Sequence, residues 1–97
     1  MKRINKNKFI EDLKKDFSNF EIQTRNKNNY MIIIESDTYY ESVVEFIPAT
    51  QEHLYTVYIN TNGNEFLNSY LVDYFKNLNL DKNYIVADRL NNIDYVC

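Results

Sequence analysis

Glycine, histidine and cysteine each occur only once in this chain, and their scarcity excludes several kinds of site. Phosphate-binding loops need several glycines so that backbone N–H groups can approach a phosphate, and Gly63 is the only glycine. Zinc sites need clustered Cys and His ligands, which His53 and Cys97 cannot provide by themselves. A nucleophile usually needs a base to activate it, and His53 falls in a polar stretch. We therefore expect no cofactor, no metal site, no catalytic residue and no enzymatic activity.

The chain also lacks the features of secreted and membrane proteins. A single thiol cannot form an internal disulfide. The longest apolar run, Tyr30–Ile34, is far shorter than the roughly 20 residues of a membrane-spanning helix. Near the N-terminus, Phe9 and Ile10 are followed at once by Glu11 and Asp12, which does not fit a signal peptide. We expect a cytoplasmic protein that does not associate with membranes.

Basic residues are missing from the middle half of the chain. No Lys or Arg occurs from residue 28 to residue 75. The same stretch holds seven acids: Glu35, Asp37, Glu41, Glu45, Glu52, Glu65 and Asp73. Residues 1–30 carry eight basic and four acidic residues, whereas residues 31–97 carry three and ten. Because such an acidic part repels nucleic acid and attracts basic surfaces, we expect a protein partner and no direct binding of nucleic acid.

The residues that are abundant predict one folded domain that covers residues 1–97. Hydrophobic residues make up 44% of the chain and aromatic residues 15%, with nine Tyr and six Phe, which is too apolar for a disordered protein. Phe9, Ile10, Leu13 and Phe17 recur at helical spacing. Asn5 or Asn7 is a suitable N-cap for that helix.

After the first helix the apolar period changes from helical spacing to alternation. Alternation predicts a strand over residues 20–25, and the apolar run over residues 30–35 predicts a central strand that is apolar on both faces. Further strands are predicted over residues 39–47 and 54–59, with Pro48 ending the first of these two. Asn64 is a suitable N-cap for a second helix, whose apolar stripe is Phe66, Leu67, Tyr70, Leu71, Tyr74, Phe75 and Leu78. In the tail, Val86, Leu90, Ile93 and Cys97 favour a last helix, although residues 84–87 alone would suit a short strand.

The predicted fold class is therefore α+β. An N-terminal helix is followed by a four-stranded antiparallel meander, and one or two C-terminal helices pack on the sheet.

The acids of the third strand suggest a binding surface. Glu41 and Glu45 share one face, and same-face residues along a strand are about 6.6 Å apart, which is comparable to the step between phosphates in a nucleic acid. We predict that a partner contacts Glu35, Asp37, Tyr39, Glu41, Glu45 and Glu52, with Tyr40, Tyr55 and Tyr58 as further aromatic candidates. One alternative is acid–base chemistry by Glu35 with Glu41, and another is an ordinary solvated sheet face with tyrosines in the core.

The layout resembles small phage-encoded inhibitors of the anti-CRISPR type that mimic DNA. The shared features are the length, the acidic strands and the helix–sheet–helix order, together with a turn at residues 62–66 that leads into a helix ending at residues 75–77. The resemblance implies a non-catalytic inhibitor that occupies the basic nucleic-acid-binding site of a nuclease. The alternatives are an immunity protein or antitoxin that neutralises a basic toxin, and an accessory protein that forms homo-oligomers.

Overall fold

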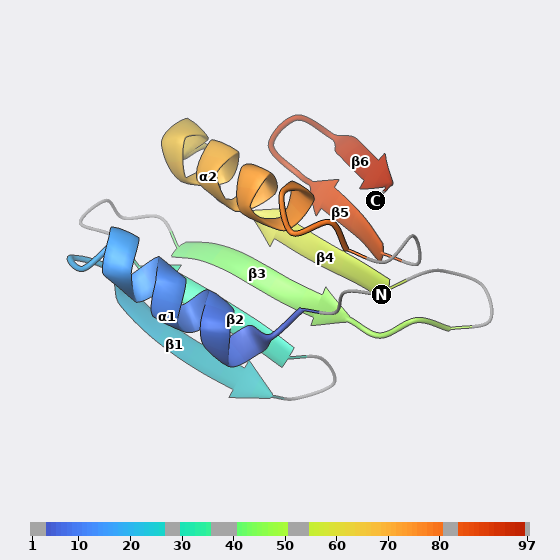
Figure 1. Ribbon diagram of the computed structural model, residues 1–97. Coiled ribbons are helices and arrows are strands. Elements are labelled where there is room, and N and C mark those ends of the chain that lie inside the picture. Colours follow the sequence, from blue (N-terminus) through green and yellow to red (C-terminus); the bar gives the residue numbers. More distant parts are fainter. Residues whose placement is uncertain (1–3, 27–29, 36–40, 51–54, 81–83, 97) are drawn as a thin grey trace.

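Two helices lie on one side of a six-stranded sheet in the computed structural model (Figure 1). The structure describes residues 4–26, 30–35, 41–50, 55–80 and 84–96. The elements in chain order are α1 (Lys6–Asp16), β1 (Glu21–Asn26), β2 (Tyr30–Glu35), β3 (Glu41–Ile47), β4 (Tyr55–Asn60), α2 (Glu65–Lys76), β5 (Tyr84–Asp88) and β6 (Ile93–Val96). The α+β class is therefore confirmed.

Both helices begin at asparagine caps that the sequence indicates. The Asn5 side chain accepts a hydrogen bond of 3.0 Å from the Lys8 backbone N–H, and Asn64 accepts one of 3.0 Å from the N–H of Leu67. Each bond satisfies an N–H group that has no partner within its own helix. With 11 and 12 residues, neither of these two described helices is long and apolar enough to cross a bilayer.

The strands follow one another across the sheet in the order β1-β2-β3-β4-β5-β6. The first four form the expected antiparallel meander. The chain then crosses over through α2, so that β5 pairs parallel with β4, and β6 returns antiparallel to β5. The sheet is thus mixed, with six strands instead of the four that we expected.

The prediction of a last helix in the tail is wrong, because local turn chemistry overrides the helical spacing. Tyr84–Asp88 is rich in residues that favour strands. The Asp88 carboxylate accepts hydrogen bonds from the backbone N–H groups of Leu90 and Asn91, at 3.0 and 3.1 Å. Asn92 then adopts a positive φ of 54°, which Asn tolerates well. Together these residues turn the chain into a β5–β6 hairpin.

The core lies between the sheet and the helices. Alternate strand residues point toward the helices, and the buried ones among them are Ile32, Ile34, Val44, Phe46, Val57, Ile59 and Val86. They pack against the buried helix residues Phe9, Leu13, Leu67, Leu71 and Phe75.

One residue of the predicted α2 stripe is misplaced, since the Phe66 residue is 76% exposed. The buried stripe of α2 is centred on Leu67, Leu71 and Phe75, and it also includes Val72 and Asn68. Phe66 lies at the edge of this buried stripe, on the same side of the helix as Tyr70, which follows four residues later and is partly buried. At that margin it contacts Phe17 of the α1 C-cap, with the ring centroids 6.2 Å apart.

Candidate functional site

No described helix covers the sheet face opposite α1 and α2, which we call the open face (Figure 1). Because successive strand residues point to opposite faces, Glu35 and Ile33 on β2 point to the open face while Ile34 between them is in the core. The pairing registers then show which open-face residues are neighbours across the strands.

Three glutamates stand side by side at one end of the open face. Glu21 on β1 is directly opposite Glu35 on β2, and Glu35 is directly opposite Glu41 on β3. We call these three residues the acidic row. Adjacent strands are about 4.8 Å apart, and like charges directly opposite each other destabilise a sheet. Within the described part of the chain, no Lys or Arg forms an ion pair with any of the three.

An apolar strip lies beside the acidic row, on the same two central strands. Ile33 on β2 is directly opposite Val43 on β3, and Met31 follows Ile33 two residues back along β2. Ile33 is only 4% exposed, and Met31 and Val43 are partly exposed. The open face therefore combines negative charge at its end with apolar surface next to it.

The predicted site residues divide into two groups. Glu35, Glu41 and Glu45 are described, and all three lie on the open face, as alternation predicts for Glu41 and Glu45. Asp37, Tyr39 and Glu52 lie outside the described residues, as does Tyr40.

Two other predicted residues, Glu45 and Tyr55, are described but do not belong to the acidic row. Glu45 is opposite Met31 and Tyr58 on the open face, and it already has an interaction partner within the chain. Tyr55 is on the other face, where its ring stacks on that of Tyr84 with centroids 5.2 Å apart.

Sequence reasoning missed Glu21 as a member of the site. Its alternation with Ile22 does indicate that it points away from the core. Its neighbour across the strands depends on the register of the β1–β2 hairpin, and alternation within one strand does not specify that register.

Among the described residues, the far side of the open face, on β4 to β6, has no excess of either charge. Arg89 directly follows β5 and forms an ion pair with Asp94 on β6. Its guanidinium carbon also lies 5.9 Å from the centre of the Tyr58 ring. Among the described residues, the negative charge of the open face thus lies mainly over β1, β2 and β3, where the base Arg25 on β1 also lies on this face, directly opposite Met31.

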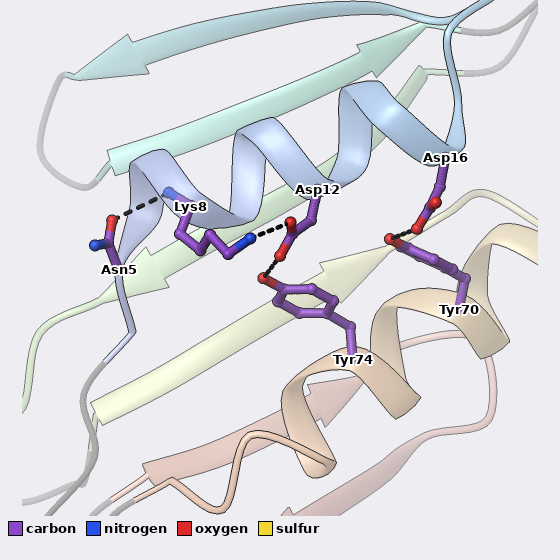
Figure 2. A network of polar contacts seen from close by, with 6 residues as sticks. All are labelled: Asn5, Lys8, Asp12, Asp16, Tyr70 and Tyr74. Carbon is purple, nitrogen blue, oxygen red and sulfur yellow. Dashed lines mark hydrogen bonds and ion pairs between the residues drawn. The ribbon is translucent and has the colours of Figure 1, made fainter.

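A second polar region lies between the two helices (Figure 2). The Tyr70 hydroxyl donates a hydrogen bond of 2.6 Å to Asp16, and the Tyr74 hydroxyl donates one of 2.8 Å to Asp12. Lys8 forms an ion pair of 2.7 Å with Asp12. These contacts border a groove of about 470 Å³, and they tie α1 to α2.

Ionisation in this groove favours a structural role. The hydrogen bond from Lys8, followed by the one from Tyr74, lowers the pKa of Asp12. Burial, followed by the hydrogen bonds to Asp16 and Asp12, raises the pKa values of Tyr70 and Tyr74 above their ordinary range. The phenols therefore stay protonated as donors and the Asp12 carboxylate stays ionised as an acceptor, so this arrangement does not supply an activated nucleophile.

A buried polar network joins α2 to the end of β5. Asp88 is only 1% exposed, and its carboxylate accepts hydrogen bonds from the side chains of Asn68 and Asn91, at 3.0 and 2.8 Å. Asn68 in turn accepts a bond of 3.0 Å from the Thr61 hydroxyl. Burial opposes ionisation of Asp88, but the hydrogen bonds outweigh it and lower its pKa.

Every polar side chain in this network has a protein partner, which indicates a structural role. Across the described ranges of the chain, no group of three or more His, Cys, Asp or Glu side chains is arranged to hold a metal ion.

Comparisons with protein-family models, with curated proteins and with solved structures found no match to this chain. Any inference about function therefore starts from the chemistry of the acidic row and the apolar strip beside it.

Proposed function

We propose that this protein is a non-catalytic inhibitor that binds a basic nucleic-acid-binding site of a nuclease through the open face of its sheet. The observation that carries the proposal is the acidic row, in which Glu21, Glu35 and Glu41 are direct cross-strand neighbours. Their mutual repulsion destabilises the free protein, and a basic surface placed over them would relieve it.

The charge and the apolar strip would contribute differently to binding. Complementary charge raises the rate of association and selects against wrong partners. Burial of apolar groups such as Met31 and Val43 slows dissociation, because water is excluded from the centre of the interface. The open face offers both kinds of group next to each other, which suits a partner whose basic residues border an apolar patch.

The glutamates do not reproduce the spacing of phosphates along a nucleic-acid strand, so the structure supports simple coverage of a basic site better than close mimicry of DNA. Along β3, Val43 stands between Glu41 and Glu45 on the same face, so these two carboxylates are about 13 Å apart along the strand. The closer set of charges runs across the strands instead. We therefore propose that the protein blocks a basic site by covering it, as the resemblance to anti-CRISPR inhibitors implies.

Cleavage assays test this proposal directly. We would assay RNA-guided DNA nucleases and basic toxin nucleases with increasing amounts of the protein, at several concentrations of DNA and salt. We expect inhibition that added DNA overcomes and that weakens at high salt. Inhibition of a toxin nuclease alone would assign the protein as an immunity protein or antitoxin.

The double variant Glu35→Gln/Glu41→Gln should inhibit much less than the wild type. Glu11→Gln, which removes an exposed acid from α1 on the other side of the molecule, is the matched control and should inhibit normally. Equal inhibition by both variants would refute a role for the acidic row, and a concentration-dependent dimer without nuclease binding would favour the accessory protein.

A further inference from the structure

We infer that β1, at one edge of the sheet, pairs with β1 of a second copy of the chain, so that two molecules share one continuous antiparallel sheet. The pairing is independent of the proposed function, because it requires only the edge of the sheet and a second molecule of the same protein.

The edge that β1 forms is open to a further strand. β2 pairs with one side of β1, and no described strand lies on its other side (Figure 1). Five of the six residues of β1 are exposed. A free edge presents unpaired backbone N–H and C=O groups, which the backbone of another strand can satisfy. The element that fits this edge is therefore an extended strand.

The backbone groups that point outward from β1 follow from the pairing of the strands. The Glu41 carbonyl accepts a hydrogen bond from the Asn62 side chain, just beyond β4, so the backbone groups of Glu41 point toward β4. Residues directly opposite each other in an antiparallel pair exchange either two hydrogen bonds or none. Glu41 therefore exchanges none with Glu35, and Glu35 exchanges two with Glu21. Because successive residues alternate between the two sides of a strand, the outward-pointing groups of β1 belong to Ile22, Thr24 and Asn26.

The side chains of β1 match those of a second, antiparallel β1 in one register. With Gln23 on the two-fold axis, Glu21 is directly opposite Arg25 of the second copy, and the reverse pair follows by symmetry. The outward-pointing Ile22 and Thr24 are then directly opposite each other and exchange hydrogen bonds. The register thus supplies reciprocal ion pairs and reciprocal backbone hydrogen bonds.

The charges on β1 select this register over its neighbours. An axis at Thr24 would place Gln23 opposite Arg25, and an axis at Ile22 would place Glu21 opposite Gln23, so neither forms an ion pair. Opposite charges directly across two strands stabilise a sheet. Over the described ranges of the chain, neither Glu21 nor Arg25 has an ion-pair partner within its own molecule. Both side chains are therefore available to a second copy.

The other edge of the sheet does not match itself in this way. β6 carries one charged residue, Asp94, which forms an ion pair with Arg89 of the same chain. Two copies of β6 therefore cannot form reciprocal ion pairs, and charge complementarity favours β1 as the edge that joins two molecules.

Sedimentation velocity over a range of protein concentrations tests the pairing. We expect the wild type to form a dimer. Glu21→Arg and Arg25→Glu each place like charges opposite each other, so each should be monomeric. The double variant Glu21→Arg/Arg25→Glu restores the ion pairs with their direction reversed and should dimerise again. Its composition equals that of the wild type, so a change in net charge cannot explain the recovery.

Disulfide trapping tests the register, with Cys97→Ser in every variant. The two Gln23 residues form a non-hydrogen-bonded pair in the inferred dimer, with Cα atoms about 4.5 Å apart, a separation that a disulfide spans. Gln23→Cys should therefore give a covalent dimer under mild oxidation. Thr24→Cys is the matched control at a neighbouring exposed position. Its counterpart is displaced by about 6.6 Å along the strand as well as across it, which exceeds the reach of about 7 Å, so it should stay monomeric.

A covalent dimer of Gln23→Cys but not of Thr24→Cys, together with recovery of the dimer in the double variant, would support the pairing. A wild type that is monomeric at every concentration would overturn it. So would single charge variants that still dimerise, a double variant that does not, or stronger trapping through Thr24→Cys. None of these results bears on nuclease inhibition, so each would leave the proposed function standing.

Discussion

Replacing Glu35 with Gln should stabilise the free protein while weakening its binding to a basic partner. Glu35 is the middle member of the acidic row, with Glu21 on one side and Glu41 on the other. Gln keeps the size of the side chain and removes its charge, so both repulsive contacts disappear. Cross-strand charge pairs are worth about 0.2–1 kcal/mol each, and two of them predict a gain of about 0.4–2 kcal/mol in the free energy of unfolding.

Thermal unfolding followed by circular dichroism measures this gain. For a domain of this size, about 1 kcal/mol corresponds to a rise of about 4–8 °C in Tm. The rise should be largest near 0.01 M salt and should shrink in 1 M salt, where the Debye length of about 3 Å is shorter than the spacing between strands. Glu11→Gln is the control and should leave Tm nearly unchanged. A lower Tm for Glu35→Gln, or a gain that salt does not alter, would refute electrostatic repulsion within the row.

Four further variants test the rest of the structure. Val44→Asp should unfold the domain, because the Val44 side chain is fully buried and its replacement would bury an unpaired carboxylate; native-like circular dichroism would contradict its place in the core. Asp88→Ala should destabilise the protein by at least about 1–3 kcal/mol, because buried donors lose their acceptor. Since the pKa of Asp88 is lowered from 3.8, the part of that difference that depends on the ionised carboxylate should be fully present above pH 3.8 and be lost as the pH falls through the lower folded-state pKa, which urea unfolding at a series of pH values would detect. Phenolate absorbance should show two tyrosines ionising well above the ordinary pKa of 10.0, and the variants Tyr70→Phe and Tyr74→Phe should each remove one of them. Because the folded-state pKa values are raised, the stability that these phenols contribute should be lost as the pH rises past 10.

Local signals in the sequence predict most of the elements of this fold. Asn5 and Asn64 mark the starts of both helices because a short polar side chain can satisfy a free backbone N–H there. Pro48 marks the end of β3, since proline cannot donate a hydrogen bond to the ladder. The strands of the meander follow either from the alternation of apolar and polar residues, as in β1, or from a run that is apolar on both faces, as in β2. Each of these features depends only on residues that are close together in the chain, so it can be recognised without knowledge of the tertiary structure.

The remaining features depend on contacts between distant segments. The tail has apolar residues at helical spacing, yet Asp88 closes a turn at Leu90 and pairs with Asn68 on α2, 20 residues away. The acidic row likewise needs the registers of two hairpins before Glu21 and Glu41 can be placed beside Glu35. Alternation predicts which way a glutamate points, but only the pairing shows which charges it meets.

The order of the strands also has a consequence for how this chain folds as it is synthesised. Every strand of the described sheet lies next to the strand that precedes it in the chain. When β2, β3 or β4 leaves the ribosome, the strand it pairs with has therefore already emerged, and only β5 must wait for the intervening α2 before it joins the edge of the sheet. Contacts between segments that are close in the chain form quickly. The sheet can therefore grow from β1 toward β6 during translation, with each new strand pairing to the edge formed by the strand before it.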